Sequence, residues 1–320
     1  MTQKKIDNNS NELDVNYTIP LPPEIIYEIF SYLDENSQSN LALTQRMFGR
    51  SVFQKDRVAR VTKKLFALAG SAEQDKMEEI LKKWPEFLSV YAPLKDISGR
   101  VFKNVTLFQH ALWTGDVRYM ANMMLDCLQN QEEGESIRQE LLHQYQELME
   151  KGLSYELNGQ SYQEKQFSLQ PLIDALTTYV KNFSNLTYEE RCSNWCTQVG
   201  LNQIRLPAHI RHHYCDSEES FWDTTFCNEK FTRSLKLYNY IKSSEELWNE
   251  SLVGLGVKFA IKGQAAVGAR GVNCARLDLK AIEALCKVRT EDLRLFIQRL
   301  QTPIQNLEKD QEQELRYTGS

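Results

Sequence analysis

Several features that mark common protein classes are missing from this chain of 320 residues. It has no excess of basic residues, because 38 Lys and Arg face 43 Asp and Glu, and a nucleic-acid partner is therefore not expected. No apolar run reaches the roughly 18 residues of a transmembrane helix, so no membrane span is expected. Residues 1–16 are polar and lack the apolar stretch of a secretory signal peptide.

The chain is also poor in the residues that punctuate strand-rich folds. Its 14 Gly and 8 Pro favour helices over a strand-and-turn architecture, and the sequence predicts an all-α fold. The 7 Cys are odd in number and scattered, which favours reduced thiols over a disulfide framework. Together these features predict a cytosolic protein.

Residues 21–33 form the clearest amphipathic helix signal. Pro22 and Pro23 suit the first helical turn, where a missing N–H costs nothing, and Glu24 suits the positive helix end. Apolar side chains then recur at helical spacing, and these are Ile25, Ile26, Ile29, Phe30 and Leu33. Because this stripe follows a polar tail, its cover is either the rest of the chain or a second protein.

The region that follows adds a short helix with Leu41 and Leu43 and a longer one from about Arg46 to Leu65. Residues 17–62 resemble an F-box, with Leu21 and Pro22 at its start and a third helix at its end, although the usual tryptophan is missing. The resemblance implies docking on the SKP adaptor of a cullin–RING ubiquitin ligase. The implied contact residues are Leu21, Pro22, Ile25, Ile26, Ile29, Phe30, Leu33, Leu41 and Leu43. The alternative is an ordinary amphipathic helix packed inside an α-domain.

Residues 63–130 resemble ankyrin repeats, with one good unit and one degenerate unit upstream. The family roles in the turn and the two helices fall to Asp96, Gly99, Thr106, Phe108, Ala111, Gly115 and Asp116. Leu107 and Gln109 replace the usual proline and histidine. Because a solenoid needs about three stacked units, we expect neighbouring helices to complete this one.

Residues 131–307 are predicted to form a helical C-terminal domain that binds a partner or substrate. Helices are predicted over 131–153 and 169–180, with a short hairpin or loop over 154–164. A capping box at Thr187 and Glu190 predicts another helix start, and Asp278 and Thr290 predict the starts of two more. The tails, 1–16 and 308–320, are expected to lack regular structure.

A zinc site is the main competitor to a pure binding module. Cys192, Cys196, His209 and His213 have the spacing of a two-Cys, two-His zinc finger. Gly200 stands where the core aromatic belongs, and Pro207 falls inside the helix that should present His209. Cys215, close to His213, leaves a cysteine nucleophile open as well. Buried structural cysteines and surface histidines are the simpler interpretation, and no metal, cofactor or catalytic residue is predicted.

The chain from residue 66 to residue 302 also resembles a module of type IV-secreted effectors of intracellular bacteria. Segments 96–100, 157–160, 169–176, 207–209 and 288–293 carry this resemblance, and Glu308, Glu312 and Glu314 resemble an export signal. The resemblances imply an F-box adaptor that recruits an unknown target for ubiquitination, without catalysis of its own. For a secreted effector, the implied location is the host cell cytoplasm. The alternatives are an ankyrin-like scaffold without a ligase and the zinc protein or enzyme described above.

Overall fold

The computed structural model describes residues 48–128, 133–216, 219–222, 225–228, 233–239, 244–247 and 272–304. The chain divides into two units, Met1–Val61 and Thr62–Ser320. Of the first unit only residues 48–61 are described, as the beginning of helix α3, Phe48–Gly70. The predicted contact residues for SKP, from Leu21 to Leu43, and both predicted tails lie outside the described residues.

The second unit contains a four-stranded antiparallel sheet, so the prediction of an all-α fold is wrong and the fold is mixed α/β. The strands are β1 (Ala92–Lys95), β2 (Val101–Val105), β3 (Leu153–Leu157) and β4 (Gln160–Glu164), in that spatial order. A separate hairpin joins β5 (Lys236–Asn239) to β6 (Ser244–Leu247). The four-stranded sheet needs few glycines, because short turns close its β1–β2 and β3–β4 hairpins and helices connect β2 to β3.

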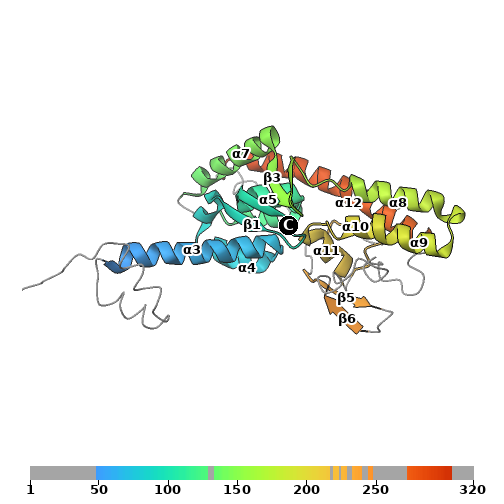
Figure 1. Cartoon of the computed structure of the whole chain (residues 1–320). Helices are drawn as coiled ribbons and strands as arrows, with labels where there is room; N and C mark the ends of the chain where they lie inside the picture. Colours follow the sequence, from blue (N-terminus) through green and yellow to red (C-terminus); the bar gives the residue numbers. More distant parts are fainter. Residues whose placement is uncertain are drawn as a thin grey trace, which may run out of the picture. The chain divides into compact units, whose positions relative to one another are not determined.

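The helices of this unit run in two groups (Figure 1). The first group precedes and interrupts the sheet: α4 (Gln74–Leu81), η1 (Pro85–Ser89), α5 (Leu107–Thr114), η2 (Val117–Ala121), α6 (Asn122–Asp126) and α7 (Gly134–Lys151). The second group follows the sheet: α8 (Gln170–Asn182), η3 (Phe183–Asn185), α9 (Tyr188–Asn194), η4 (Trp195–Gly200), α10 (Leu201–Gln203), α11 (Ala208–Cys215) and α12 (Val272–Gln301).

The residues with predicted ankyrin-like roles lie in the β1–β2 turn and in and around helix α5. Asp96 Oδ1 accepts hydrogen bonds from the amides of Ser98 and Arg100 in the β1–β2 turn. Thr106 forms a capping box with Gln109 at the start of α5, and Gly115 ends α5 with φ of +80°. The strands β1 and β2 then join β3 and β4 in one sheet, and the upstream candidate, α3 and α4, contains no strand.

Helix α12 is continuous, and the predicted division into helices capped by Asp278 and Thr290 is wrong. Asp278 is buried and accepts a hydrogen bond from Trp222 Nε1 at 2.5 Å. Thr290 Oγ1 donates to the carbonyl of Cys286 one turn earlier, at 2.9 Å, which is a mid-helix arrangement of threonine. Asp and Thr both favour the N-cap position at the start of a helix. In this helix, however, Asp278 accepts a hydrogen bond from a distant side chain and Thr290 bonds to the preceding turn.

The other helical predictions agree closely with the structure. Helix α7 lies within the predicted 131–153, and α8 begins next to Leu169 as expected. Thr187 and Glu190 form the predicted capping box at the start of α9. The segment 154–164 is the β3–β4 hairpin.

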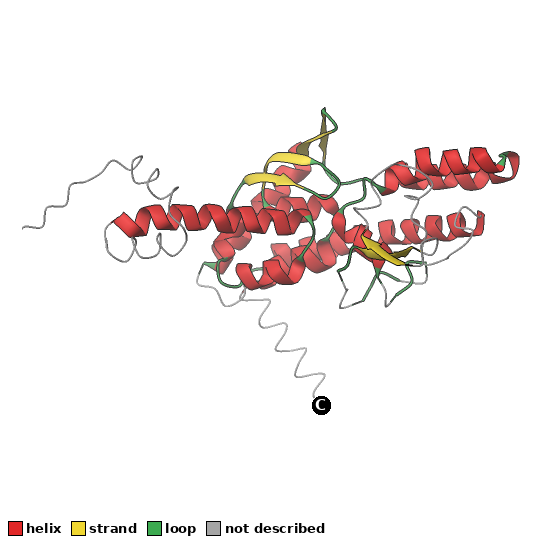
Figure 2. Ribbon diagram, turned by 60° about the horizontal axis from the view of Figure 1, so that its bottom comes forward, coloured by secondary structure: helices red, strands yellow, loops and turns green. Residues whose placement is uncertain are grey.

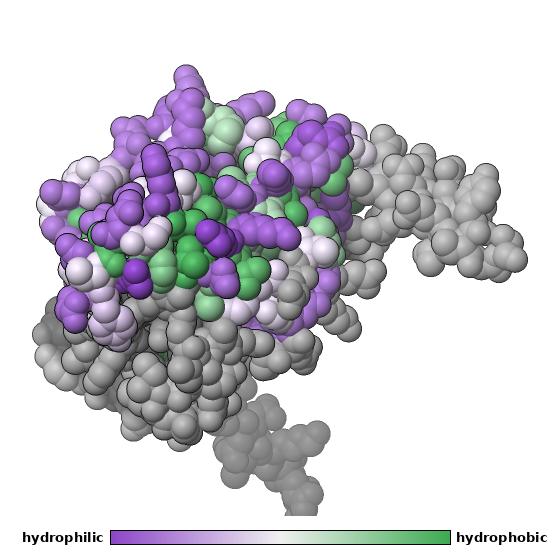
Figure 3. Space-filling view, turned by 90° about the vertical axis from the view of Figure 1, so that its right-hand side faces the viewer, coloured by the Kyte–Doolittle hydropathy of each residue, from purple (hydrophilic) through white to green (hydrophobic). Residues whose placement is uncertain are grey.

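A buried core joins the helices that follow the sheet. Its largest members are Trp195 and Tyr179, whose rings meet edge to face with centroids 4.9 Å apart. Ile282 and Leu285 belong to the same core and bring in the first half of α12, which packs along α8. Apolar atoms are also visible on the face of this group shown in Figure 3, bordered by polar ones.

The second half of α12 packs against the first group of helices. Phe296 contacts Phe108 of α5, with ring centroids 5.8 Å apart, and Asp292 pairs with Arg118 of η2 at 2.5 Å. The carbonyl of Leu300 accepts a hydrogen bond from Arg138 of α7. One long helix therefore ties the two groups together.

Candidate binding site

The sheet is incomplete between its two central strands. Strands β2 and β3 pair at Val101 and Glu156, and within the described residues the pairing goes no further. By contrast, β3 and β4 pair over their whole length, from Leu153 with Glu164 to Leu157 with Gln160. The β1–β2 pair and the β3–β4 hairpin accordingly run in different directions (Figure 2). The two hairpins meet at one point and separate from there.

Each hairpin has a local reason for its own geometry. Asn158 and Gly159 have φ of +51° and +76°, the two positive values that a tight two-residue hairpin turn requires. The register of the β1–β2 pair changes instead, because one extra residue of β2, between Phe102 and Val105, lies opposite Pro93. Pro93 has no N–H to donate to a neighbouring strand. A register shift of this kind bends and twists a strand, so β2 turns away from β3.

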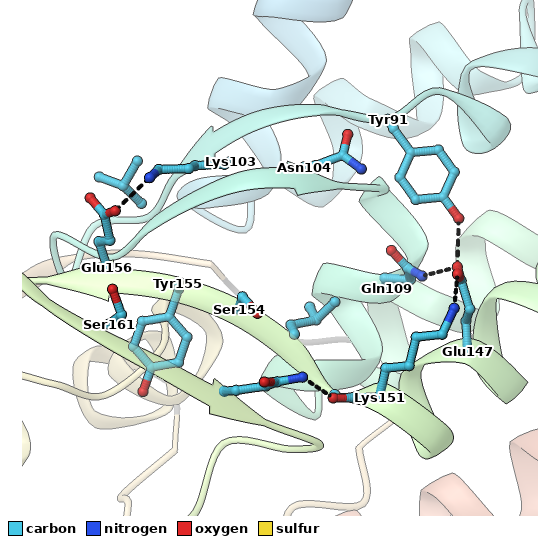
Figure 4. Close-up of a pocket in the computed structure, with 14 residues that line it drawn as sticks. Tyr91, Lys103, Asn104, Gln109, Glu147, Lys151, Ser154, Tyr155, Glu156 and Ser161 are labelled. Carbon is cyan, nitrogen blue, oxygen red and sulfur yellow. Dashed lines mark hydrogen bonds and ion pairs between the residues drawn. The ribbon is translucent and has the colours of Figure 1, made fainter.

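A cleft of about 430 Å³ occupies the space between the separated strands, and we call it the wedge. Figure 4 shows β2 along one side of it and the β3–β4 hairpin along the other. It is lined by Tyr91, Val101, Lys103, Asn104, Gln109, Glu147, Lys151, Gly152, Leu153, Ser154, Tyr155, Glu156, Ser161 and Gln163. Its volume lies in the range of small-ligand and peptide sites in proteins.

Ion pairs stand at both ends of the wedge. At the narrow end Lys103 Nζ lies 2.6 Å from Glu156 Oε1 (Figure 4). At the wide end Glu147 accepts hydrogen bonds from Lys151 at 2.9 Å, Tyr91 at 3.0 Å and Gln109 at 3.4 Å. Every charged side chain of the lining therefore has a partner of opposite sign.

These contacts also set the protonation states of Glu147 and Tyr91 at the wide end. The hydrogen bonds from Lys151 and Tyr91 lower the pKa of Glu147. Partial burial and the neighbouring Glu147 raise the pKa of Tyr91 to about 12. Glu147 is thus a firmly ionised acceptor and Tyr91 a neutral donor at neutral pH, an arrangement suited to binding rather than to proton transfer.

The predicted zinc ligands lie on three elements: Cys192 on α9, Cys196 on η4, and His209 and His213 on α11. Across the described residues no three Cys, His, Asp or Glu side chains come close enough together to hold a metal ion. Helix α11 begins just after Pro207, so this proline does not interrupt it as the sequence suggested. Burial raises the pKa of Cys215 to about 12, which keeps its thiol protonated and opposes a role as nucleophile.

Instead, α11 forms a buried polar junction with the first group of helices. Asp116, the residue that caps η2, pairs with Arg233 at 2.7 Å. Burial alone would raise the pKa of Asp116, but Arg233 and His209 bring it well below its usual range. Burial lowers the pKa of His209 well below 6.5, and that of His213 to about 3. The expectation that these histidines lie at the surface is wrong, because both are buried. The neutral imidazoles fill the junction, where the cavity measures only about 10 Å³ and admits no substrate.

The wedge was not among the sites that the sequence predicted. A signal for half of it is present, because Leu153–Leu157 alternates buried and exposed side chains and Asn158 with Gly159 is the strongest short hairpin motif. The separation of β2 from β3 has no such signal. It depends on how two hairpins, about 50 residues apart in the chain, meet in space.

Comparison with known proteins places this α/β protein in a family. A family model described as the CBUA0006 C-terminal domain matches residues 171–300, the part that holds most of the helical core. The uncharacterized protein CBUA0006 of Coxiella burnetii (strain RSA 493 / Nine Mile phase I) is 32% identical over 267 residues, which cover 76% of this chain and 76% of that protein. The chain therefore belongs to the CBUA0006 family. No solved structure matches it.

Proposed function

We propose that this protein is a non-catalytic adaptor that brings a target protein to a cullin–RING ubiquitin ligase. Residues 17–62 dock on the SKP adaptor through the apolar stripe that begins at Leu21 and Pro22. The second unit holds the target. The ligase then transfers ubiquitin to a target that is held nearby, and the chain contributes proximity alone.

The observation that supports this proposal most is the division of the chain at Val61 and Thr62. It falls within helix α3, Phe48–Gly70, next to the end of the segment that resembles an F-box, so this helix connects the two units. The body adds an open cleft whose charged groups are paired, and its buried cysteine and histidines are held in neutral forms. These features suit partner binding better than chemistry.

A pull-down with purified SKP adaptor tests the docking step. We expect the full chain to retain the adaptor, and the double variant Leu21→Ala with Pro22→Ala to lose at least about 90% of it, because a few apolar anchors dominate such interfaces. The matched control is Leu295→Ala, an exposed leucine of α12 in the other unit. Circular dichroism checks that each variant is folded.

The scaffold without a ligase link makes the opposite prediction. In that case the wild-type chain does not retain the adaptor, and the double variant behaves like it. Elemental analysis of the purified chain covers the zinc alternative, since a stoichiometric metal would contradict the adaptor proposal as stated.

We also propose that the chain acts in the cytoplasm of a host cell after export from a bacterium. The family relative in Coxiella burnetii supports a bacterial rather than a eukaryotic origin. Within the described residues no helix has the length and apolar character to cross a membrane. A translocation reporter fused to the chain should reach the host cytoplasm, and deletion of residues 308–320 should reduce its delivery at least about tenfold.

A further inference from the structure

The facing edges of β2 and β3 carry main-chain groups that the sheet does not use. From the pair Val101 and Glu156, a continued ladder would next place Lys103 opposite Ser154, and the described part of the chain contains no such pair. Leu157 and Gln160 flank the two-residue turn, so they form a hydrogen-bonded pair, and alternate residues of β3 share its direction. The N–H and C=O of Ser154 therefore point away from β4, into the wedge.

The same reasoning applies to the opposite wall. The carbonyl of Arg100 accepts from the amide of Asp96 at 3.0 Å, so Arg100 faces β1 and Val101 faces β3. Two residues further on, the extra residue that β2 holds between Phe102 and Val105 interrupts this alternation, so on this wall the direction is assigned for Val101 alone. The β3 wall of the wedge offers the donor and the acceptor of Ser154, and a segment in extended conformation can satisfy them.

The side chains of the wedge narrow the choice of occupant. Its charges cancel, because Lys103 pairs with Glu156 and Lys151 with Glu147. Val101, Leu153 and Tyr155 add apolar surface to the lining. A charged ligand would have to break an ion pair to find a partner, whereas an uncharged segment would not.

We propose that the wedge binds a short, extended, uncharged segment of another protein, which adds as a strand to the edge of β3 that faces β2. Main-chain hydrogen bonds to Ser154 hold the segment, as in other cases of strand addition. That this segment belongs to the ubiquitination target rests on the proposed function above. The binding itself does not.

The test begins with the full-length chain and an unbiased library of displayed peptides about twelve residues long. We expect selected peptides to bind with dissociation constants below about 100 µM, measured by fluorescence anisotropy with the best peptide. Ser154→Trp fills the wedge and should weaken binding at least about tenfold. The matched control is Gln160→Trp, exposed on the same hairpin but outside the wedge lining, which should change affinity less than about twofold.

Methylation of the peptide's own amides tests the strand geometry without changing the protein. N-methyl groups at alternate positions should weaken binding at least about tenfold, and those at the intervening positions should have little effect, because successive amides of a strand point in opposite directions. If Ser154→Trp does not fold, Asn104→Trp fills the wedge from the other wall.

Three results would overturn the proposal: no peptide binds the full chain, binding is indifferent to both tryptophan variants, or no alternate pattern of methylation matters. The variant with Leu21→Ala and Pro22→Ala should bind the selected peptide like the wild type. Failure of SKP docking and failure of the wedge are therefore separate outcomes.

Discussion

Two regions of the second unit differ in how the N–H and C=O groups of their main chain are paired. The sheet region, residues 62–168, leaves part of a ladder unpaired and opens a cleft of about 430 Å³. The helical region, residues 169–216 and 272–304, pairs most of its main chain within helices and closes around Trp195 and Tyr179. Strands need partners from elsewhere and helices do not, so an unfinished sheet can recruit another chain. The comparison suggests that the sheet region binds and the helical region supports it.

The two regions meet at a polar junction as well as at the apolar contact between Phe108 and Phe296. Arg289 of α12 donates to the carbonyl of Thr114 at 2.6 Å, and Arg233 holds Asp116. Breaking this junction should separate the two regions, which makes acid the strongest perturbation.

We expect stability to fall by about 4–6 kcal/mol between pH 7 and pH 5. Burial lowers the pKa of His212 and His213 to about 3 and that of His110 to about 4. The unfolded chain takes up protons below about pH 6.5 that the folded chain refuses, so stability is complete above that pH and is lost as pH falls toward 4. Each of these histidines contributes up to about 2 kcal/mol by pH 5, and so does His209, whose pKa burial lowers well below 6.5. Asp278 offsets about 2 kcal/mol of the loss, because burial raises its pKa to about 7 and the folded chain takes up that proton as pH falls.

Urea unfolding at the two pH values measures this loss. His143, exposed on α7, supplies the control, because His143→Gln should leave the difference between pH 7 and pH 5 unchanged. Equal stability at both values would mean that the junction histidines are not buried as described.

The next prediction compares the regions directly. Trp195→Ala removes the largest side chain of the helical core and should cost about 3–5 kcal/mol, because the cavity cannot collapse fully. Ser154→Trp in the wedge should change stability by less than about 1 kcal/mol, since Ser154 is exposed. Chemical denaturation of both variants at pH 7 measures the two losses of unfolding free energy. Similar losses would contradict the difference in packing between the helical core and the wedge.

The smallest effects come from two glycines with positive φ. Gly115→Ala should cost about 2–4 kcal/mol, because an added Cβ is strained at φ of +80° and also meets the guanidinium of Arg289. Gly159→Ala has similar strain, at +76°, but no atom within 4 Å, and should cost only about 1–2 kcal/mol. Thermal unfolding of the two variants separates backbone strain from packing. Equal decreases in melting temperature would contradict the close approach of Arg289 to Gly115.

Local signals in the sequence predicted several helices in both regions. The capping box at Thr187, the start of α8 and the extent of α7 follow from side chains within one turn of the helix end. Asp278 and Thr290 misled because the same side chains that cap helices can also accept a buried donor or bond to the preceding turn. The hairpin at Asn158 and Gly159 was anticipated only as one of two possibilities.

What the sequence determined by itself is the set of elements whose hydrogen bonds close within a few residues: helices, caps and the tight turn of the β3–β4 hairpin. The tertiary structure alone decided the four-stranded sheet, the course of α12 across both regions and the wedge. The physical reason is that a strand is completed by residues distant in the chain, and a register shift at Pro93 alters where β2 finds them. The proposed binding site therefore arises from a pairing that the fold leaves unfinished.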